Sequence, residues 1–181
     1  STDAATQAGA EPVEEPYDDV IIATGSRPFV PPMEGFGGSG TFLFRTIDDC
    51  ARIADCAREN QRAAVIGRGL LGLEAARGLL THGVEVTVLE AADRPMQRVV
   101  CPALSEFYRV RHEREGVRIH CNVAVNGFTG EGRVRSVVCG EQEFPADVVI
   151  TGVGIAPDVT LAAAAGLKCD NGIWVDESCR T

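Results

Sequence analysis

The sequence of 181 residues lacks long apolar runs and an excess of positive charge. No segment approaches the roughly 20 apolar residues that a membrane-spanning helix needs, and we expect no signal peptide at its start. Only 17 Lys and Arg residues stand against 26 Asp and Glu residues, which gives a net charge of −9. An acidic chain is poorly suited to nucleic acid or an anionic membrane surface, so we expect neither as a partner.

The chain also lacks the paired cysteines and histidines of metal sites. Its seven cysteines form no CxxC pair, and its histidines at 82, 112 and 120 show no ligand spacing. An odd number of scattered cysteines does not favour a disulfide framework. We therefore expect free thiols in a reducing, cytoplasmic compartment and no metal site. No Ser–His–Asp or Cys–His arrangement is visible, so no catalytic residue is predicted.

Residues 63–90 have the order of a dinucleotide-binding unit. The apolar run 63–66 predicts a buried parallel strand, residues 70–82 predict a helix, and residues 84–90 predict a second strand. We expect Leu70, Leu73, Ala76 and Leu80 to form the core-facing side of that helix.

Three glycines lie between the first strand and the helix. Gly67 permits the tight turn, Gly69 lets the backbone approach a pyrophosphate, and Gly72 lets the helix lie close to the strand. The amides of Leu70 and Leu71 then offer free N–H groups and partial positive charge to the two phosphates. The pattern predicts dinucleotide binding; the alternative is a glycine turn that only packs the unit.

Glu90 ends the second strand and is placed to accept hydrogen bonds from an adenosine ribose. A carboxylate there repels a 2′-phosphate, which favours NAD over NADP. Arg94 and Arg98 follow in the next loop and could accept such a phosphate. Solvated loop charges are an equally good interpretation of these two arginines, so their effect stays open.

The remaining segments predict an α/β fold, with a Rossmann-like parallel sheet and an antiparallel β-meander. The helix at 102–115 starts at Pro102, and we expect Leu104, Phe107 and Tyr108 as its buried stripe. Thr46 is the expected cap of the helix at 48–59. Further strands are expected at 19–24, 41–44, 117–121, 147–151 and 172–175, the meander at 122–128, 133–139 and 142–145, a helical turn at 160–166, and loops at 1–16 and 28–40.

Four motifs resemble the FAD-dependent pyridine-nucleotide oxidoreductases, in their ferredoxin, putidaredoxin and rubredoxin reductase branch. Residues 17–25 are similar to the Ala-Thr-Gly segment that leaves the flavin domain, and residues 44–49 are similar to its Arg-Thr linker. Residues 66–74 with Glu90 resemble the nucleotide site, and residues 149–158 resemble the return into the flavin domain.

The resemblance implies that NADH reduces FAD and that the flavin passes electrons to a small iron–sulfur protein. It places Glu74 at the nicotinamide end and implies that Gly154 lets the nicotinamide approach. The alternatives are a stabilising carboxylate near a helix N-terminus for Glu74 and a plain tight turn for Gly154. It places Arg45, Thr24 and Gly25 beside the flavin, where they would be idle without the rest of that domain.

Two departures from the family concern the flavin site. The family has an earlier GxGxxG motif and a later Ala-Gly-Asp motif, and neither stands in this sequence. We therefore expect 1–44 to be a partial FAD-domain segment and linker, 45–151 an NAD(H)-binding domain, and 152–181 an incomplete return into the FAD domain. The chain is then an internal piece that is inactive alone. Asp158 also replaces a more usual Asn.

Other functions remain as alternatives. Disulfide reductases of the wider superfamily use a CxxxxC pair, but five residues separate Cys50 from Cys56 on the expected linker helix, so we reject a redox disulfide. Within the same fold, the chain could be the flavin and NADH portion of a nitrite reductase. From another class, it could be a module similar to apoptosis-inducing factor, in which nucleotide binding governs a protein partnership. The acidic chain has no large basic insertion to favour the last alternative.

Overall fold

The computed structural model describes residues 14–30, 32–33 and 35–181. It forms two compact units: a larger one, Ser26–Ala156, and a smaller one that joins the described residues before Ser26 with Pro157–Thr181. Most of the loop expected at 1–16 lies outside the described residues. The domain boundaries drawn from the sequence, at 44/45 and 151/152, stay a prediction.

The larger unit is built on a five-stranded parallel sheet in the order β2-β9-β3-β4-β5. Its strands are β2 (Thr41–Leu43), β9 (Val148–Thr151), β3 (Arg62–Ile66), β4 (Glu85–Leu89) and β5 (Arg118–His120). A second, antiparallel sheet contains β6 (Gly127–Thr129), β7 (Ser136–Cys139) and β8 (Gln142–Pro145). The predicted α/β fold with a parallel sheet and a β-meander is therefore confirmed.

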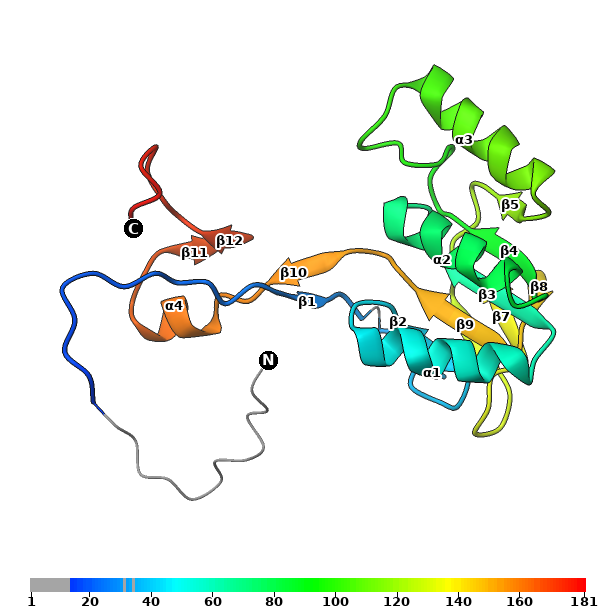
Figure 1. Ribbon diagram of the computed structural model, residues 1–181, viewed down its shortest axis with the longest axis horizontal. Helices are drawn as coiled ribbons and strands as arrows, with labels where there is room; N and C mark the ends of the chain where they lie inside the picture. The colour runs from blue at the N-terminus through cyan, green and yellow to red at the C-terminus, as the bar shows by residue number, and fades with distance from the viewer. Residues whose placement is uncertain (1–13, 31, 34) are drawn as a thin grey trace. The chain divides into compact units, whose positions relative to one another are not determined.

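The inner strands β3, β4 and β9 are buried along most of their length, because both faces of the parallel sheet are covered. Figure 1 shows α1 (Ile47–Arg58) and α2 (Leu70–Leu80) in front of this sheet and the meander behind it. Val65 packs in one core cluster with Leu79 of α2, whereas its neighbour Ile66 packs in a second cluster with Val137 of β7. Successive side chains of a strand point to opposite faces, so one short run supplies both cores.

Local signals place the helix starts. Thr46 caps α1 in a capping box with Asp49, as predicted. Pro102 is the first residue of α3 (Pro102–Arg114), where its missing N–H has no cost. No helix in the described part of the chain is long and apolar enough to cross a membrane.

The strand predicted at 19–24 is wrong. Val20 and Ile21 are 61% and 91% exposed and have no regular structure. The pairing instead joins β1 (Ser26–Pro28) to β10 (Ile155–Pro157). An apolar β-branched run becomes a strand only where a partner strand completes its hydrogen bonds.

Other elements are shorter than predicted. The expected strand at 122–128 is observed only as β6, which extends to residue 129, and the one at 133–139 begins later, as β7. Gly130 and Gly132 lie between them at positive φ. The expected strand at 172–175 shrinks to β12 (Gly172–Ile173), which pairs with β11 (Cys169–Asp170), and the helical turn is α4 (Thr160–Ala164).

The apolar stripe predicted for α3 is also wrong. Leu104 and Phe107 are 41% and 61% exposed, while Ser105 and His112 are buried and Tyr108 is half-buried. The Ser105 hydroxyl donates to the carbonyl of Pro95 at 2.6 Å, a hydrogen bond that belongs to the inner face of this helix. On α2, Leu73 and Ala76 are buried and Leu80 is half-buried as expected, but Leu70 is 59% exposed.

Candidate functional site

The turn between β3 and α2 lies at the carboxyl edge of the parallel sheet. Strand β3 has β4 on one side and β9 on the other, so the chain order reverses at this point of the sheet. Ligands of open α/β sheets bind in the crevice at such a switch point. Gly67 begins the turn with φ of +95°, and an added Cβ would lie 2.6 Å from the carbonyl oxygen of Gly152. Only glycine fits there.

Gly72 and Gly69 differ in what the protein itself requires of them. A Cβ at Gly72 would lie 2.1 Å from the carbonyl oxygen of Gly67, so close packing of α2 on the turn demands glycine. A Cβ at Gly69 would meet no atom within 4 Å, and its φ of −68° suits any residue. Packing therefore accounts for Gly67 and Gly72 but not for Gly69, where the open space fits a bound phosphate.

The start of α2 is free to receive an anion. Gly69 is its N-cap, and no side chain caps the helix. The N–H groups of Leu70, Leu71 and Gly72 have no intrahelical acceptor, since they belong to the first turn. Leu70 and Leu71 are 59% and 51% exposed. Backbone donors and the helix dipole thus converge on the open space beside Gly69.

Glu90 is connected to this turn by main-chain hydrogen bonds. One carboxylate oxygen accepts the N–H of Arg68 at 2.9 Å, and the other accepts the N–H of Ala92 at 2.8 Å. Each carboxylate oxygen has a second lone pair, so Glu90 can still accept hydrogen bonds from a ribose. The side chain therefore fixes the turn and keeps acceptor capacity for a ligand.

The two loop arginines have different surroundings. Arg94 is half-buried, and its Nη2 donates to the carbonyl of Gln97 at 3.2 Å. Arg98 is exposed. The loop itself is tied to the turn, because the N–H of Met96 donates to the carbonyl of Arg68. The influence of the arginines on the choice between NAD and NADP stays open.

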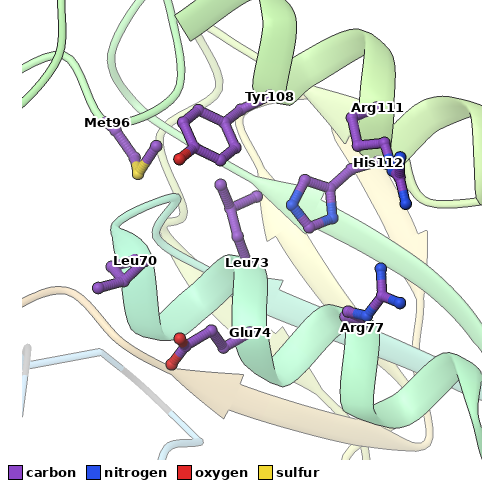
Figure 2. Close-up of a pocket in the computed structure, with 8 residues that line it drawn as sticks. All are labelled: Leu70, Leu73, Glu74, Arg77, Met96, Tyr108, Arg111 and His112. Carbon is purple, nitrogen blue, oxygen red and sulfur yellow. The ribbon is translucent and has the colours of Figure 1, made fainter. Parts of the chain in front are cut away.

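A cavity of about 260 Å³ lies between α2 and α3, next to the turn. Figure 2 shows Tyr108 and His112 pointing from α3 toward Leu73, while the Glu74 carboxylate is directed away from α3. Burial lowers the pKa of His112, and its Nδ1 has no partner among the described residues. The residues that line the cavity are Leu70, Leu73, Glu74, Arg77, Met96, Tyr108, Arg111 and His112.

The remaining predicted site residues lie in other segments. Gly154 adopts φ of +133° with open space around it, and its carbonyl accepts the N–H of Phe29 at 2.9 Å. In the larger unit, Arg45 donates to the Ser26 hydroxyl at 3.0 Å. In the smaller unit, the Thr24 hydroxyl donates to the carbonyl of Asp158, whose N–H donates to the carbonyl of Gly25.

The structure brings Gly67, Gly69, Leu70, Leu71, Gly72 and Glu90 into one site. It also reveals a residue that was not predicted, the fully buried Arg68. The middle position of a GxG turn carries no pattern of its own, so no sequence signal identifies it. Cys50 and Cys56 are free thiols, and in the described ranges no cluster of His, Cys, Asp and Glu could hold a metal ion.

Comparisons with known proteins agree with this geometry. The model of the pyridine nucleotide-disulphide oxidoreductase family matches residues 3–181. Putidaredoxin reductase of Pseudomonas putida is 38% identical over 176 residues, which cover 91% of this chain and 41% of that protein. The NAD(P)H nitrite reductase of Bacillus subtilis is 36% identical over 168 residues, which cover 92% of this chain and 21% of that protein.

A solved structure shares the fold. The ferredoxin reductase for the CYP199A2 system from Rhodopseudomonas palustris superimposes with a TM-score of 0.83 and 36% identity, over 86% of this chain and 39% of that one. The chain therefore spans well under half the length of these relatives.

Proposed function

The chain belongs to the pyridine nucleotide-disulphide oxidoreductase family, and from this premise we propose that its larger unit binds NADH for an FAD-dependent reductase. The observation that carries the proposal is the open space at Gly69, beside an uncapped helix start at a switch point of the sheet. The amides of Leu70 and Leu71 hold the pyrophosphate, and Glu90 holds the adenosine ribose.

The nicotinamide half extends from the turn toward Glu74 and Gly154. Support comes from the exposed Glu74 carboxylate, which is directed away from α3, and from the open space at Gly154. The loop after β9 adjoins the turn, because the N–H of Gly152 donates to the carbonyl of Ile66 at 2.9 Å. Glycine at 154 leaves the backbone accessible to a planar ring.

In the whole enzyme, bound FAD would supply the chemistry that takes hydride from NADH and releases single electrons to a small iron–sulfur protein. Thr24, Gly25 and Arg45 are the residues of this chain that we assign to the flavin. The names of the relatives, putidaredoxin reductase and ferredoxin reductase, support this kind of acceptor. The free thiols support a reducing, cytoplasmic location.

A nitrite reductase is the second candidate. The Bacillus subtilis enzyme is 36% identical over nearly the whole chain, close to the 38% of putidaredoxin reductase. Both candidates require the same NADH site, so they differ only in where the electrons go.

The test of NADH binding compares the ratio of NADH affinity to NADPH affinity in wild type with the same ratio in a Glu90 variant. We expect wild type to bind NADH about tenfold or more tightly than NADPH, because an unpaired 2′-phosphate beside Glu90 costs about 1.4 kcal/mol or more. Glu90→Gln keeps the size of the side chain and removes the charge. It should bring the NADH-to-NADPH ratio, measured by titration calorimetry, close to one.

The ratio separates recognition from the structural role of Glu90. If the carboxylate only fixes the turn, Glu90→Gln weakens both nucleotides by the same factor and the ratio stays unchanged. If wild type binds neither nucleotide, the proposed function is wrong. Equal affinities in wild type would show that Arg94 or Arg98 overrides the acid.

A further inference from the structure

Arg68 is a buried cation inside the nucleotide-binding turn. Its side chain is 0% exposed, its Nη1 donates to the sulfur of Cys121 at 2.8 Å, and its Nη2 donates to the carbonyl of Ala92 at 3.3 Å. Its Nε has no partner within the described part of the chain. Among the described residues the Glu90 carboxylate accepts the main-chain N–H groups of Arg68 and Ala92, and it makes no hydrogen bond to the guanidinium.

A buried guanidinium stays charged and favours a negative partner. The group cannot lose its proton in a protein, and a buried charge without a counter-charge is costly. Among the described residues, the Arg68 guanidinium donates hydrogen bonds to a thiol sulfur and to a carbonyl oxygen. The Arg68 guanidinium therefore places a positive charge 2.8 Å from the Cys121 sulfur, and cysteines beside a cation are the ones that react with oxidants.

Cys121 is both reachable and connected to the site. It is half-buried and follows β5 directly. The two residues after it are tied to the end of β4: the N–H of Asn122 donates to the carbonyl of Ala92, and that of Val123 to the carbonyl of Glu90. Arg68 then links the sulfur to the Gly67–Gly69 turn. A change at Cys121 therefore acts both on this turn and on the residues around Glu90.

We propose that Cys121 is an oxidation site through which hydrogen peroxide lowers the affinity of the chain for NADH. The sulfur attacks one peroxide oxygen, a sulfur–oxygen bond forms, and the oxygen–oxygen bond breaks. Sulfur is oxidised to a sulfenic acid while peroxide is reduced, and the departing oxygen takes the thiol proton and leaves as water. The product is reversible by thiols.

The added oxygen has to be accommodated next to Arg68. The sulfur already lies 2.8 Å from Nη1, so an oxygen added on the side of Arg68 displaces the guanidinium. Arg68 has little room to move, since its side chain is fully buried between the turn and the loop after β4. The shift is transmitted to the main-chain N–H that Glu90 accepts, and the ribose site is distorted.

The first experiment measures reaction rates of single cysteines in the 181-residue wild-type chain. Peroxide is added with dimedone as the trap, and mass spectrometry follows each cysteine. Cys56 is the matched control: it is also half-buried, and its sulfur accepts the amide N–H of Asn60 at 3.5 Å. Burial raises its pKa, although the charge of Arg133 nearby opposes that shift. Exposed Cys50 is a second control.

We expect Cys121 to be labelled about tenfold or more faster than Cys56, and faster than Cys50 despite its lower exposure. In urea the three rates should converge. Arg68→Met should abolish the advantage, whereas Arg68→Lys should retain part of it because the charge remains. A Cys121 rate no higher than that of Cys56 in folded wild type overturns the proposal.

The second experiment rests on the proposed function, because it measures NADH affinity. Peroxide treatment should weaken NADH binding about tenfold, dithiothreitol should restore it, and Cys121→Ser should bind NADH normally with or without peroxide. Unchanged affinity of chain oxidised at Cys121 overturns the proposal. If the untreated chain binds no NADH, the proposed function is wrong and the regulatory role of Cys121 fails with it. The labelling rates of the first experiment still decide whether Cys121 is the oxidation site.

Discussion

Alanine at position 69 and alanine at position 72 make the same chemical change in the same turn, yet the structure predicts very different losses of stability. The Cβ at position 69 would meet no atom within 4 Å, and the backbone there has ordinary dihedral angles. The Cβ at position 72 would lie 2.1 Å from the carbonyl oxygen of Gly67 and 3.5 Å from a methyl group of Val65. One position is open space, and the other is filled by backbone.

The expected losses of stability follow from these distances. Gly69→Ala weakens the N-cap of α2 and costs about 1 kcal/mol or less. Gly72→Ala forces α2 away from the turn by roughly 1 Å, and we expect about 3 kcal/mol, the upper end of the range for overpacking. At roughly 4 °C per kcal/mol, the melting temperature falls by up to about 4 °C for Gly69→Ala and by about 12 °C for Gly72→Ala.

The loss of NADH affinity should not be proportional to the loss of stability in the two variants. In Gly69→Ala the methyl group occupies the space that the pyrophosphate needs, so affinity should fall about tenfold or more although the fold is kept. Gly72→Ala loses affinity together with stability because the amides of the first helical turn move with α2.

Differential scanning calorimetry and titration with NADH measure both quantities on the same samples. If Gly69→Ala binds NADH like wild type, the open space at position 69 is not the phosphate site and the reasoning is wrong. If Gly72→Ala melts like wild type, the close packing of α2 on the turn does not exist in solution.

Two further predictions concern stability alone. Thr46→Ala should lower the free energy of unfolding by about 1 kcal/mol because the capping box of α1 is lost, whereas Thr46→Ser should keep the capping box and the stability. Both variants are measured by urea unfolding, and equal losses in the two would disprove the role of the hydroxyl. Burial lowers the pKa of His112, so the folded chain favours the neutral imidazole. The free energy of unfolding should therefore fall as the pH drops below about 6.5, the pKa of His112 in the unfolded chain, and should level off below its pKa in the folded chain. His112→Gln should flatten that slope between pH 7.5 and pH 5.5, and an unchanged slope would assign it to other groups.

The parts of the fold set by local chemistry could be predicted from the sequence. The glycine turn, the flanking strands and the cap at Thr46 depend on neighbours within a few residues, so their patterns are visible in the chain. The run around Val20 and Ile21 has strand-forming residues, but a strand also needs a distant partner. The residues of the run do not indicate whether such a partner strand is present.

Tertiary contacts decided the remaining features. The apolar residues of α3 suggested a stripe at Leu104 and Phe107, but the buried face contains Ser105, whose hydroxyl is bonded to a carbonyl of the loop before the helix. The sequence also indicated that Glu90 faces a ribose, but not that it accepts two main-chain N–H groups. Arg68 and Cys121 are far apart in sequence, so only the fold reveals their contact.

The location of bound NADH can be measured residue by residue with a ¹⁵N-labelled chain. As NADH is added, the amide signals of Gly69, Leu70 and Leu71 should shift most, because their N–H groups face the pyrophosphate. The amides of Arg68 and Ala92, which donate to Glu90, should follow as the ribose binds. Amide shifts that are largest around Tyr108 and His112, or that are absent at saturating NADH, would show that the glycine turn is not the nucleotide site.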